Sequence, residues 1–267
     1  MIQQALQRRQ LLQLAALGGA SLVVPHRAWT QTKIGSTPFS LGIASGSPTH
    51  DSVVLWTRLM PPFAQTPGSP GVSVRWEVAH DDKFTRLAQS GQALAVAGLA
   101  YSVHAEVQGL APDRWYFFRF LVGDAISAVG RTRTFPAPDA AVAGMRLAYA
   151  SCQRWEHGYF SAYRHMAQEN LDLVMFLGDY IYEYPRAANG VRTPPGGWVL
   201  TLDDYRQRYA THKQDADLQA MHAACPWLVT WDDHEVQNDY AGLTIGENGP
   251  DVADFAARRS AAYQAFY

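Results

Sequence analysis

The sequence predicts a β-sandwich over residues 33–137 followed by an α/β domain over residues 143–267. Two observations predict this order. Short segments rich in β-branched and aromatic residues, separated by turn residues, fill the first region. From residue 145 onward, short apolar strands alternate with helix-forming segments, as in a parallel sheet with crossover helices. Residues 136–139, Pro-Ala-Pro-Asp, indicate a linker between the two regions.

The composition is that of an ordinary globular protein. Hydrophobic residues make up 48% of the chain and charged residues 17%, with a formal net charge of −2. This balance excludes a disordered chain and a strongly basic nucleic-acid-binding protein. We therefore expect no nucleic acid as a structural partner.

The first 32 residues have the pattern of an export signal. Arg8 and Arg9 precede an uncharged apolar run over residues 11–24, which is shorter than the roughly 20 residues of a membrane span. The Arg-Arg pair followed by leucines resembles a twin-arginine signal. We expect export by the twin-arginine machinery to the periplasm or beyond, with cleavage within residues 25–32 and no stable membrane anchor afterwards. An N-terminal anchor helix is the alternative.

The β-sandwich is predicted from a series of short strands. Alternating or β-rich segments occupy residues 53–57, 72–78, 103–107, 115–120 and 132–135. Pro112 marks a turn, and Tyr116 then enters an aromatic strand. This arrangement resembles the tyrosine corner of fibronectin-type sandwiches.

The α/β region is predicted from the change of pattern at residue 145. Apolar strands are expected at residues 145–150, 173–177 and 227–231, and helices at 161–170, 202–224 and 253–266. Residues 185–200 are rich in Pro and Gly and indicate a loop. Because an α/β domain with only three strands is expected to be incomplete, the sequence predicts a fragment of a longer protein.

Chemically suggestive residues follow each of the three apolar strands, where open α/β sheets place their sites. After the first comes Cys152, which suits either a thiolate ligand or a buried structural residue. A disulfide with Cys225 is a further alternative. After the second come Gly178, which permits a tight turn, and Asp179, whose carboxylate can bridge two cations. Tyr182 can supply a phenolate, a hard anionic donor that suits trivalent iron.

The third strand is followed by an unusually polar cluster. Asp232, Asp233, His234 and Asn238 crowd together directly after an apolar segment. Such crowding is costly unless a cation compensates the charge, and oxygen ligands favour a hard ion such as calcium or magnesium. His234 suits either a metal ligand or a proton donor to a leaving group. The alternative without a functional role is a solvated loop with helix-capping aspartates.

These motifs together resemble a known family. The sequence is similar to the alkaline phosphatase D (PhoD-like) family of the metallophosphoesterase superfamily, with a Gly-Asp-x-x-Tyr spacing also similar to purple acid phosphatases. The segments that carry the resemblance are FSLGIASGSPTHDSVVLWTRL (39–59), ASCQRW (150–155), FLGDYIYEY (176–184) and TWDDHEVQND (230–239). The resemblance implies an αββα sandwich for the second domain. It also implies hydrolysis of phosphate mono- and diesters.

The resemblance further implies a ligand set and a catalytic residue. Cys152, Asp179 and Tyr182 would bind Fe³⁺. Asp179 would bridge to Ca²⁺, with Asp233 and Asn238 as oxygen ligands and Asp232 as a weaker candidate. His234 would contact the phosphate or protonate the leaving group. The family also has an Asp and a His ligand from the C-terminal part of the domain, and no motif of that kind appears before residue 267. The chain is therefore expected to lack part of its metal site, which leaves its activity in isolation open.

Three other functions fit the sequence less well than phosphoester hydrolysis. An exported, non-catalytic β-sandwich binding module would need exposed aromatic residues on the sandwich, whereas the aromatics fall mostly at inward strand positions. A zinc hydrolase usually shows His-x-His or paired cysteines, and neither occurs here. A cysteine hydrolase using Cys152 would leave the acidic clusters unexplained.

Overall fold

A computed structural model of the chain describes residues 37–61, 63 and 69–267, which belong to one compact unit. The predicted export signal, residues 1–32, lies outside the described residues. Among the residues that are described, no helix has the length and apolar character needed to cross a membrane.

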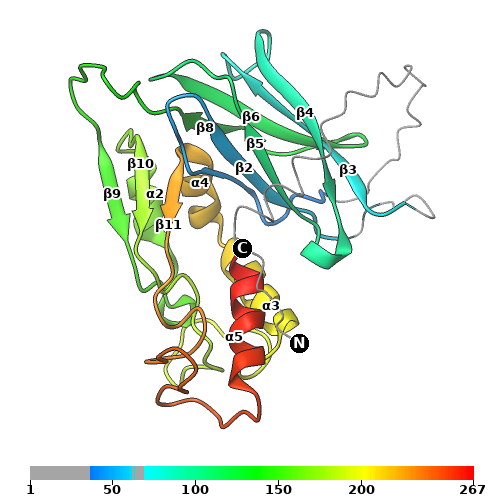
Figure 1. Cartoon of the computed structure of the whole chain (residues 1–267), viewed down its shortest axis with the longest axis vertical. Helices are drawn as coiled ribbons and strands as arrows, with labels where there is room; N and C mark the ends of the chain where they lie inside the picture. Colours follow the sequence, from blue (N-terminus) through cyan, green and yellow to red (C-terminus); the bar gives the residue numbers. More distant parts are fainter. Residues whose placement is uncertain (1–36, 62, 64–68) are drawn as a thin grey trace, which may run out of the picture. The chain divides into compact units, whose positions relative to one another are not determined.

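A β-sandwich forms the first part of the described chain (Figure 1). One sheet has the strand order β4-β3-β6-β7, with β8 also paired to β6. The facing layer consists of the antiparallel strands β5, β2 and β1. The bounds are β1 Ile43–Gly46, β2 Val53–Arg58, β3 Val72–Ala79, β4 Leu87–Ala95, β5 Ser102–Val107, β6 Trp115–Val122, β7 Ala125–Ile126 and β8 Gly130–Arg133.

The core of the sandwich follows the predicted alternation of side chains. Along β2, every second residue is buried, which places Val53 and Leu55 in the core. The predicted tyrosine corner is present. The hydroxyl of buried Tyr116 accepts a hydrogen bond from the backbone N–H of Ala111, at 2.9 Å. This bond ties the turn before β6 to the strand itself.

The second region extends one sheet of the sandwich. The strands β9 (Leu147–Ala150), β10 (Leu173–Phe176) and β11 (Trp227–Val229) run parallel to one another. Strand β11 pairs with β1 through Gly46 and Trp227, so that a single six-stranded sheet has the order β5-β2-β1-β11-β10-β9. The two predicted regions are thus joined by backbone pairing as well as by the linker.

The helices lie beside this sheet (Figure 1). Helix α2 packs against α4, α4 also contacts β1 and β8, and α3 lies against α5. Short 3₁₀ turns, η1 and η2, occupy Ala97–Leu99 and Trp155–His157. The bounds are α2 Ser161–Met166, α3 Leu202–Lys213, α4 Ala216–Ala224 and α5 Phe255–Phe266.

One predicted helix is divided in the structure. The sequence predicted a single helix over residues 202–224, but α3 ends at Lys213 and α4 begins at Ala216. Asp215 causes the break, because its side chain accepts hydrogen bonds from the backbone N–H groups of Asp217 and Leu218 and so begins a new helix. The start of α3 is a capping box between Thr201 and Asp204.

Other differences concern element ends. The predicted helix 161–170 stops at Met166, and the predicted strand 227–231 stops at Val229. The last sandwich strand lies at Gly130–Arg133 instead of residues 132–135. The fold class, a β-sandwich plus an α/β region, agrees with the prediction.

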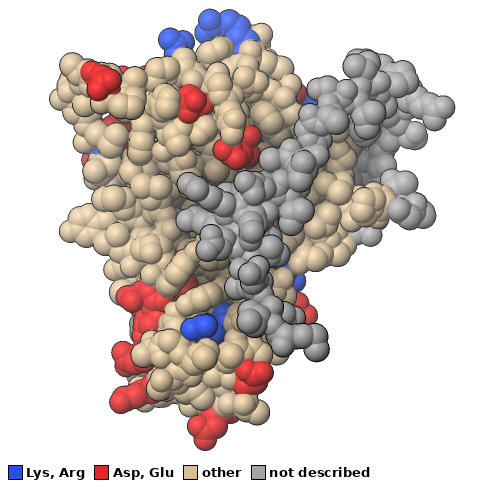
Figure 2. Space-filling view, in the orientation of Figure 1, with Lys and Arg blue, Asp and Glu red and all other residues tan. Residues whose placement is uncertain are grey.

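On the face drawn in Figure 2, Asp and Glu gather mainly over the half that holds the loops after β9, β10 and β11.

Candidate metal centre

The three predicted clusters meet at one edge of the sheet. Because β9, β10 and β11 are parallel, the loops at their carboxyl ends emerge on the same side. The first two loops are bonded directly. The backbone N–H of Cys152 donates to the carbonyl of Gly178 at 3.1 Å, and that of Gln153 donates to the carbonyl of Asp179 at 3.1 Å. The sheet therefore brings together side chains that are far apart in sequence.

The backbone at this edge is bent into rarely used conformations. Gly178 has a φ of 106°, and a Cβ placed there would lie 2.5 Å from the Cβ of Asp232. Asp179 and Cys152 both adopt left-handed conformations, with φ values of 58° and 56°. Such conformations are costly for residues other than glycine and gather at functional sites.

Glu235 holds the bent backbone in place. Its two carboxylate oxygens accept hydrogen bonds from the backbone N–H groups of Asp179 (3.2 Å), Tyr180 (2.5 Å) and Asp232 (2.8 Å). Burial raises the pKa of Glu235, while these hydrogen bonds oppose that effect by stabilising the charged form. The sequence places Glu235 in the polar cluster after the third strand but assigns it no role, because its backbone partners lie in another loop.

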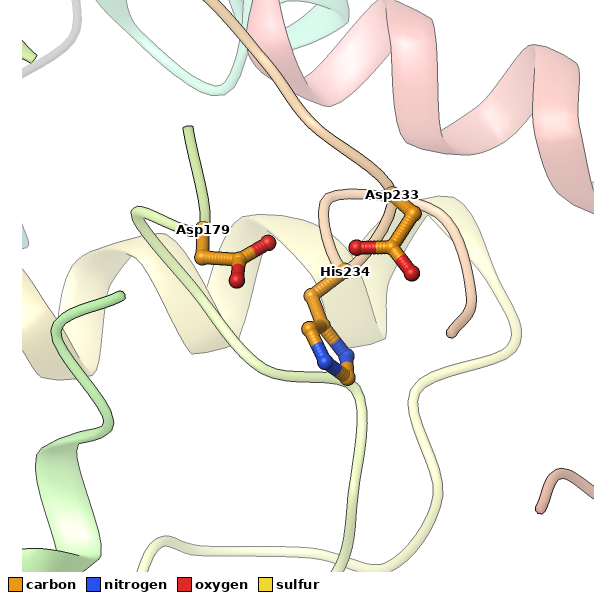
Figure 3. Close-up of side chains that lie close together, drawn as sticks. All are labelled: Asp179, Asp233 and His234. Atoms are coloured by element: carbon orange, nitrogen blue, oxygen red, sulfur yellow. The ribbon is translucent and has the colours of Figure 1, made fainter. Parts of the chain in front are cut away.

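Asp179, Asp233 and His234 form the centre of the site (Figure 3). Each offers one ligand atom, and these atoms all lie within 4.8 Å of one another. Asp179 is only 6% exposed, and its Oδ1 atom is buried without a hydrogen-bond partner among the described residues. Burial raises the pKa of Asp179, although His234 acts in the opposite direction. A bound cation would satisfy Oδ1 and favour the charged carboxylate.

Tyr182 and Cys152 adjoin this centre. The Tyr182 hydroxyl donates to Oδ2 of Asp179 at 3.1 Å, and the Cys152 side chain is within hydrogen-bonding reach of both residues. Burial, together with the negative charge of Asp179, raises the pKa of the Tyr182 hydroxyl. Without a cation this phenol stays protonated at neutral pH. Both cysteines are free, so the alternative of a disulfide between Cys152 and Cys225 is wrong.

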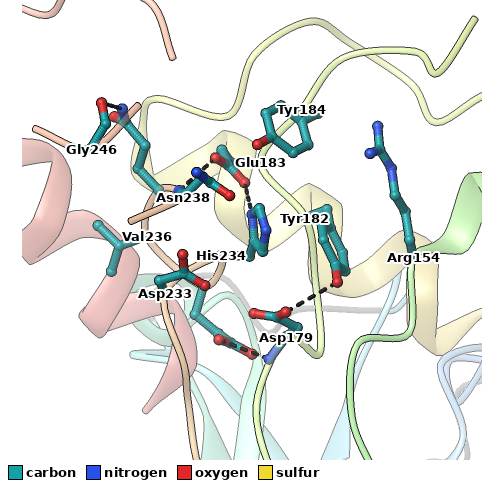
Figure 4. A network of polar contacts seen from close by, with 12 residues as sticks. Arg154, Asp179, Tyr182, Glu183, Tyr184, Asp233, His234, Val236, Asn238 and Gly246 are labelled. Atoms are coloured by element: carbon teal, nitrogen blue, oxygen red, sulfur yellow. Dashed lines mark hydrogen bonds and ion pairs between the residues drawn. The ribbon is translucent and has the colours of Figure 1, made fainter. Parts of the chain in front are cut away.

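His234 is oriented by Glu183, a residue of the second motif to which the sequence assigns no role. Its Nδ1 lies 2.8 Å from Oε2 of Glu183, which is fully buried. The other oxygen of Glu183 accepts a hydrogen bond from the backbone N–H of Asn238, at 2.9 Å (Figure 4). Burial lowers the pKa of His234, but Glu183, Asp179 and Asp233 outweigh it, so the net shift is upward.

The remaining predicted ligands lie at the rim of the centre. The side-chain amide of Asn238 donates to Asp239 at 2.6 Å, and the backbone N–H of Asp239 donates to the Asp233 carboxylate. Asp232 is exposed and participates through its backbone N–H. Asn238 thus lies in the same loop as Asp233, and the carboxylate of Asp232 points to an exposed position outside the group of three close ligand atoms.

Arg208 supports the loop that carries Tyr182. From helix α3, its buried guanidinium donates to the carbonyl oxygens of Tyr182 and Tyr184, and more weakly to that of Gly197 at 3.4 Å. Glu183 lies between the two anchored carbonyls. Arg208 therefore fixes the backbone on both sides of the carboxylate that orients His234.

The donor set suits metal binding. Carboxylate and phenolic oxygens, one imidazole and one thiol converge around an unsatisfied buried oxygen of Asp179. Hard cations prefer such oxygen donors.

Comparison with known proteins identifies the family. The sequence profile of the PhoD-like phosphatase family matches residues 147–267, and that of the PhoD-like phosphatase N-terminal domain matches residues 25–136. The chain belongs to the PhoD-like phosphatase family. It is 52% identical over 239 residues to alkaline phosphatase D of Bacillus subtilis (strain 168), an alignment that covers 87% of this chain.

A solved structure supports the same assignment. A structure described as that of PhoD superposes with a TM-score of 0.81 at 51% identity and covers 88% of this chain. The PhoD-like chain spans 41% of the length of the Bacillus protein and 46% of that solved chain. The similar region therefore comprises the sandwich and the part of the α/β region that holds the candidate metal centre.

Proposed function

We propose that this PhoD-like phosphatase hydrolyses phosphate mono- and diesters at the centre formed by Asp179, Asp233 and His234. The observation that carries the proposal is the convergence of these three side chains beside an unsatisfied carboxylate oxygen. The similarity to alkaline phosphatase D supports the reaction class. We further propose that the α/β region is part of an αββα metallophosphatase fold.

The proposed metals are Fe³⁺ and Ca²⁺. Cys152, Asp179 and Tyr182 would hold the iron, and Asp179, Asp233 and Asn238 would hold calcium. When bound, these ions supply positive charge that neutralises phosphate oxygens and lowers the pKa of water. The adjacency of the Cys152, Asp179 and Tyr182 side chains supports the shared iron site.

His234 is proposed as the residue that serves the leaving group. Its Nδ1 faces Glu183 at 2.8 Å, so a proton held there leaves Nε2 for the substrate. The upward shift in its pKa keeps the imidazole protonated over a wider pH range. A protonated imidazole can donate to the oxygen of the departing alcohol, which is the role of a general acid.

The location of the protein is a further proposal. The Arg8–Arg9 pair and the apolar run after it support export through the twin-arginine machinery to the periplasm or the exterior. That route carries folded proteins and so suits an enzyme loaded with metal before export.

The test is metal content measured together with hydrolysis. Protein from residue 33 onward is assayed with a chromogenic phosphomonoester and a chromogenic phosphodiester, with and without added calcium. Asp179→Ala is expected to abolish both metal binding and hydrolysis. Asp251→Ala, which removes an exposed carboxylate in another loop, serves as the control and is expected to change neither. If the Asp179→Ala variant binds metal and hydrolyses the esters as well as the wild type does, the proposed site is wrong.

A further inference from the structure

Arg154 lies beside the metal centre in an unusual setting. It follows Cys152 by two residues, in the loop after β9. Its guanidinium carbon is 4.8 Å from the ring centroid of Tyr184 and 5.6 Å from that of Tyr182 (Figure 4). The two tyrosine rings thus hold the guanidinium next to a residue of the metal centre.

The inner edge of this guanidinium faces a buried acid. The Nε of Arg154 lies 3.7 Å from Oε1 of Glu156, which is beyond hydrogen-bonding distance. Glu156 is fully buried, and neither of its carboxylate oxygens has a hydrogen-bond partner among the described residues. The acid therefore attracts the arginine and limits its movement without occupying its donors.

The outer edge of the guanidinium is free. The Arg154 side chain remains 22% exposed, and among the described residues no hydrogen bond has one of its terminal Nη nitrogens as donor. It borders an open cavity of about 280 Å³ that is also lined by Cys152, His157 and Tyr159. The donors are thus available to a ligand that enters this cavity.

We propose that Arg154 is a substrate-binding residue whose two Nη nitrogens donate hydrogen bonds to phosphate oxygens of the ester. This inference rests on the proposed function and deepens it. The guanidinium fork matches phosphate geometry with two parallel N–H donors. Tyr182, Tyr184 and Glu156 orient the side chain before a ligand arrives, which reduces the entropy lost on binding. The oxygens belong either to the scissile phosphate or to a second phosphate elsewhere on the same ester.

A purely structural role is the competing explanation. Arg154 lies 3.7 Å from the buried carboxylate of Glu156, and Arg208 also acts on that carboxylate electrostatically, so removing Arg154 weakens the balance of a buried charge. Two variants separate the roles. Arg154→Lys keeps a positive charge near Glu156 but loses the fork, and the double variant R154Q/E156Q removes both charges together. Arg75→Lys, on strand β3, is the matched control for an exposed arginine.

The experiment is calorimetric titration of the purified protein with inorganic phosphate. Arg154→Lys and R154Q/E156Q are each expected to lower the association constant about tenfold or more, whereas Arg75→Lys leaves it unchanged. Midpoints of urea unfolding should match wild type for Arg154→Lys. Wild-type phosphate affinity in either Arg154 variant, or no phosphate binding by the wild type, overturns the proposal.

Kinetics with two matched esters identify the source of the oxygens. The pair is thymidine 5′-(p-nitrophenyl phosphate) with and without a 3′-phosphate. A loss of kcat/KM on both esters in Arg154→Lys assigns the scissile phosphate, and a loss confined to the 3′-phosphorylated ester assigns the second phosphate. Metal content and hydrolysis of the wild type are measured on the same samples. Their absence contradicts the proposed function alone if Arg154→Lys still weakens phosphate binding.

Discussion

Glu183 and His234 form a buried pair, with Oε2 and Nδ1 2.8 Å apart across 51 residues of sequence. The pair joins the loop after β10 to the loop after β11. It leaves Nε2 of the imidazole for contacts on its other side. The orientation and the charge of His234 therefore depend on a carboxylate outside the set of proposed metal ligands.

Replacing Glu183 with glutamine is expected to lower the pKa of His234, because the variant keeps the shape of the side chain but loses its charge. In the wild type, the raised pKa adds stability that is fully present below about pH 6.5, the ordinary histidine value, and is lost as pH rises through the folded-state pKa. The stability gap between wild type and variant should therefore shrink with increasing pH. Histidine NMR titration and urea unfolding of the metal-free protein measure both effects. Glu247→Gln, an exposed substitution, is the control.

Replacing Glu235 with glutamine is expected to destabilise the fold by about 1–3 kcal/mol, since three backbone N–H groups share its carboxylate. A carboxamide offers one acceptor oxygen and places an N–H₂ group against the remaining donors. The affinity for metal should also fall, because the left-handed backbone at Asp179 loses its support. Urea unfolding and equilibrium dialysis test this, and unchanged values in both would show that Glu235 does not hold the loop.

Lys213 lies between the sandwich and the α/β region. Its Nζ is 3.0 Å from Nε2 of His222 and faces the rings of Trp56 and Tyr180 at 4.6 and 5.2 Å. Burial lowers its pKa to about 7. Because the unfolded chain retains a proton up to about pH 10.4, the unfolded state binds more protons than the folded state between pH 7 and that value.

Stability of the wild type should consequently rise with pH over this range, by up to about 1.4 kcal/mol per pH unit from this group. Lys213→Met removes the contribution, so the gap in unfolding free energy between variant and wild type should narrow as pH increases. Urea denaturation at several pH values measures it, with the exposed Lys83→Met as control. A pH-independent difference would show that Lys213 titrates normally.

Sequence patterns predicted the parts of the fold that depend on local chemistry. The period-two burial of β2, the tyrosine corner at Tyr116 and the continuous apolar strand β10 all follow from neighbouring residues. The break between α3 and α4 was not predicted, although Asp215 is a typical capping residue. Helix-forming residues flank Asp215 on both sides, so the sequence does not show that one helix ends and another begins there.

In the candidate site, too, some residues were predicted from local sequence and others were not. Asp179, Asp233 and His234 were predicted from their positions at strand ends, and the structure brings them together. Glu183 and Glu235 were missed, because their importance lies in contacts with residues of other loops. Pairing of the long sheet across Gly46 and Trp227 was likewise beyond prediction, since it joins segments 181 positions apart through a single bridge.

We propose above that Cys152, Asp179 and Tyr182 belong to one metal centre. The most direct measurement is the visible absorption spectrum of the protein loaded with iron(III). We expect an iron–phenolate band in the wild type that disappears in Tyr182→Phe and persists in Tyr184→Phe, the matched loss of a hydroxyl two residues away. Iron-loaded protein without the band, or a band unchanged by Tyr182→Phe, would show that Tyr182 is not a ligand of the iron.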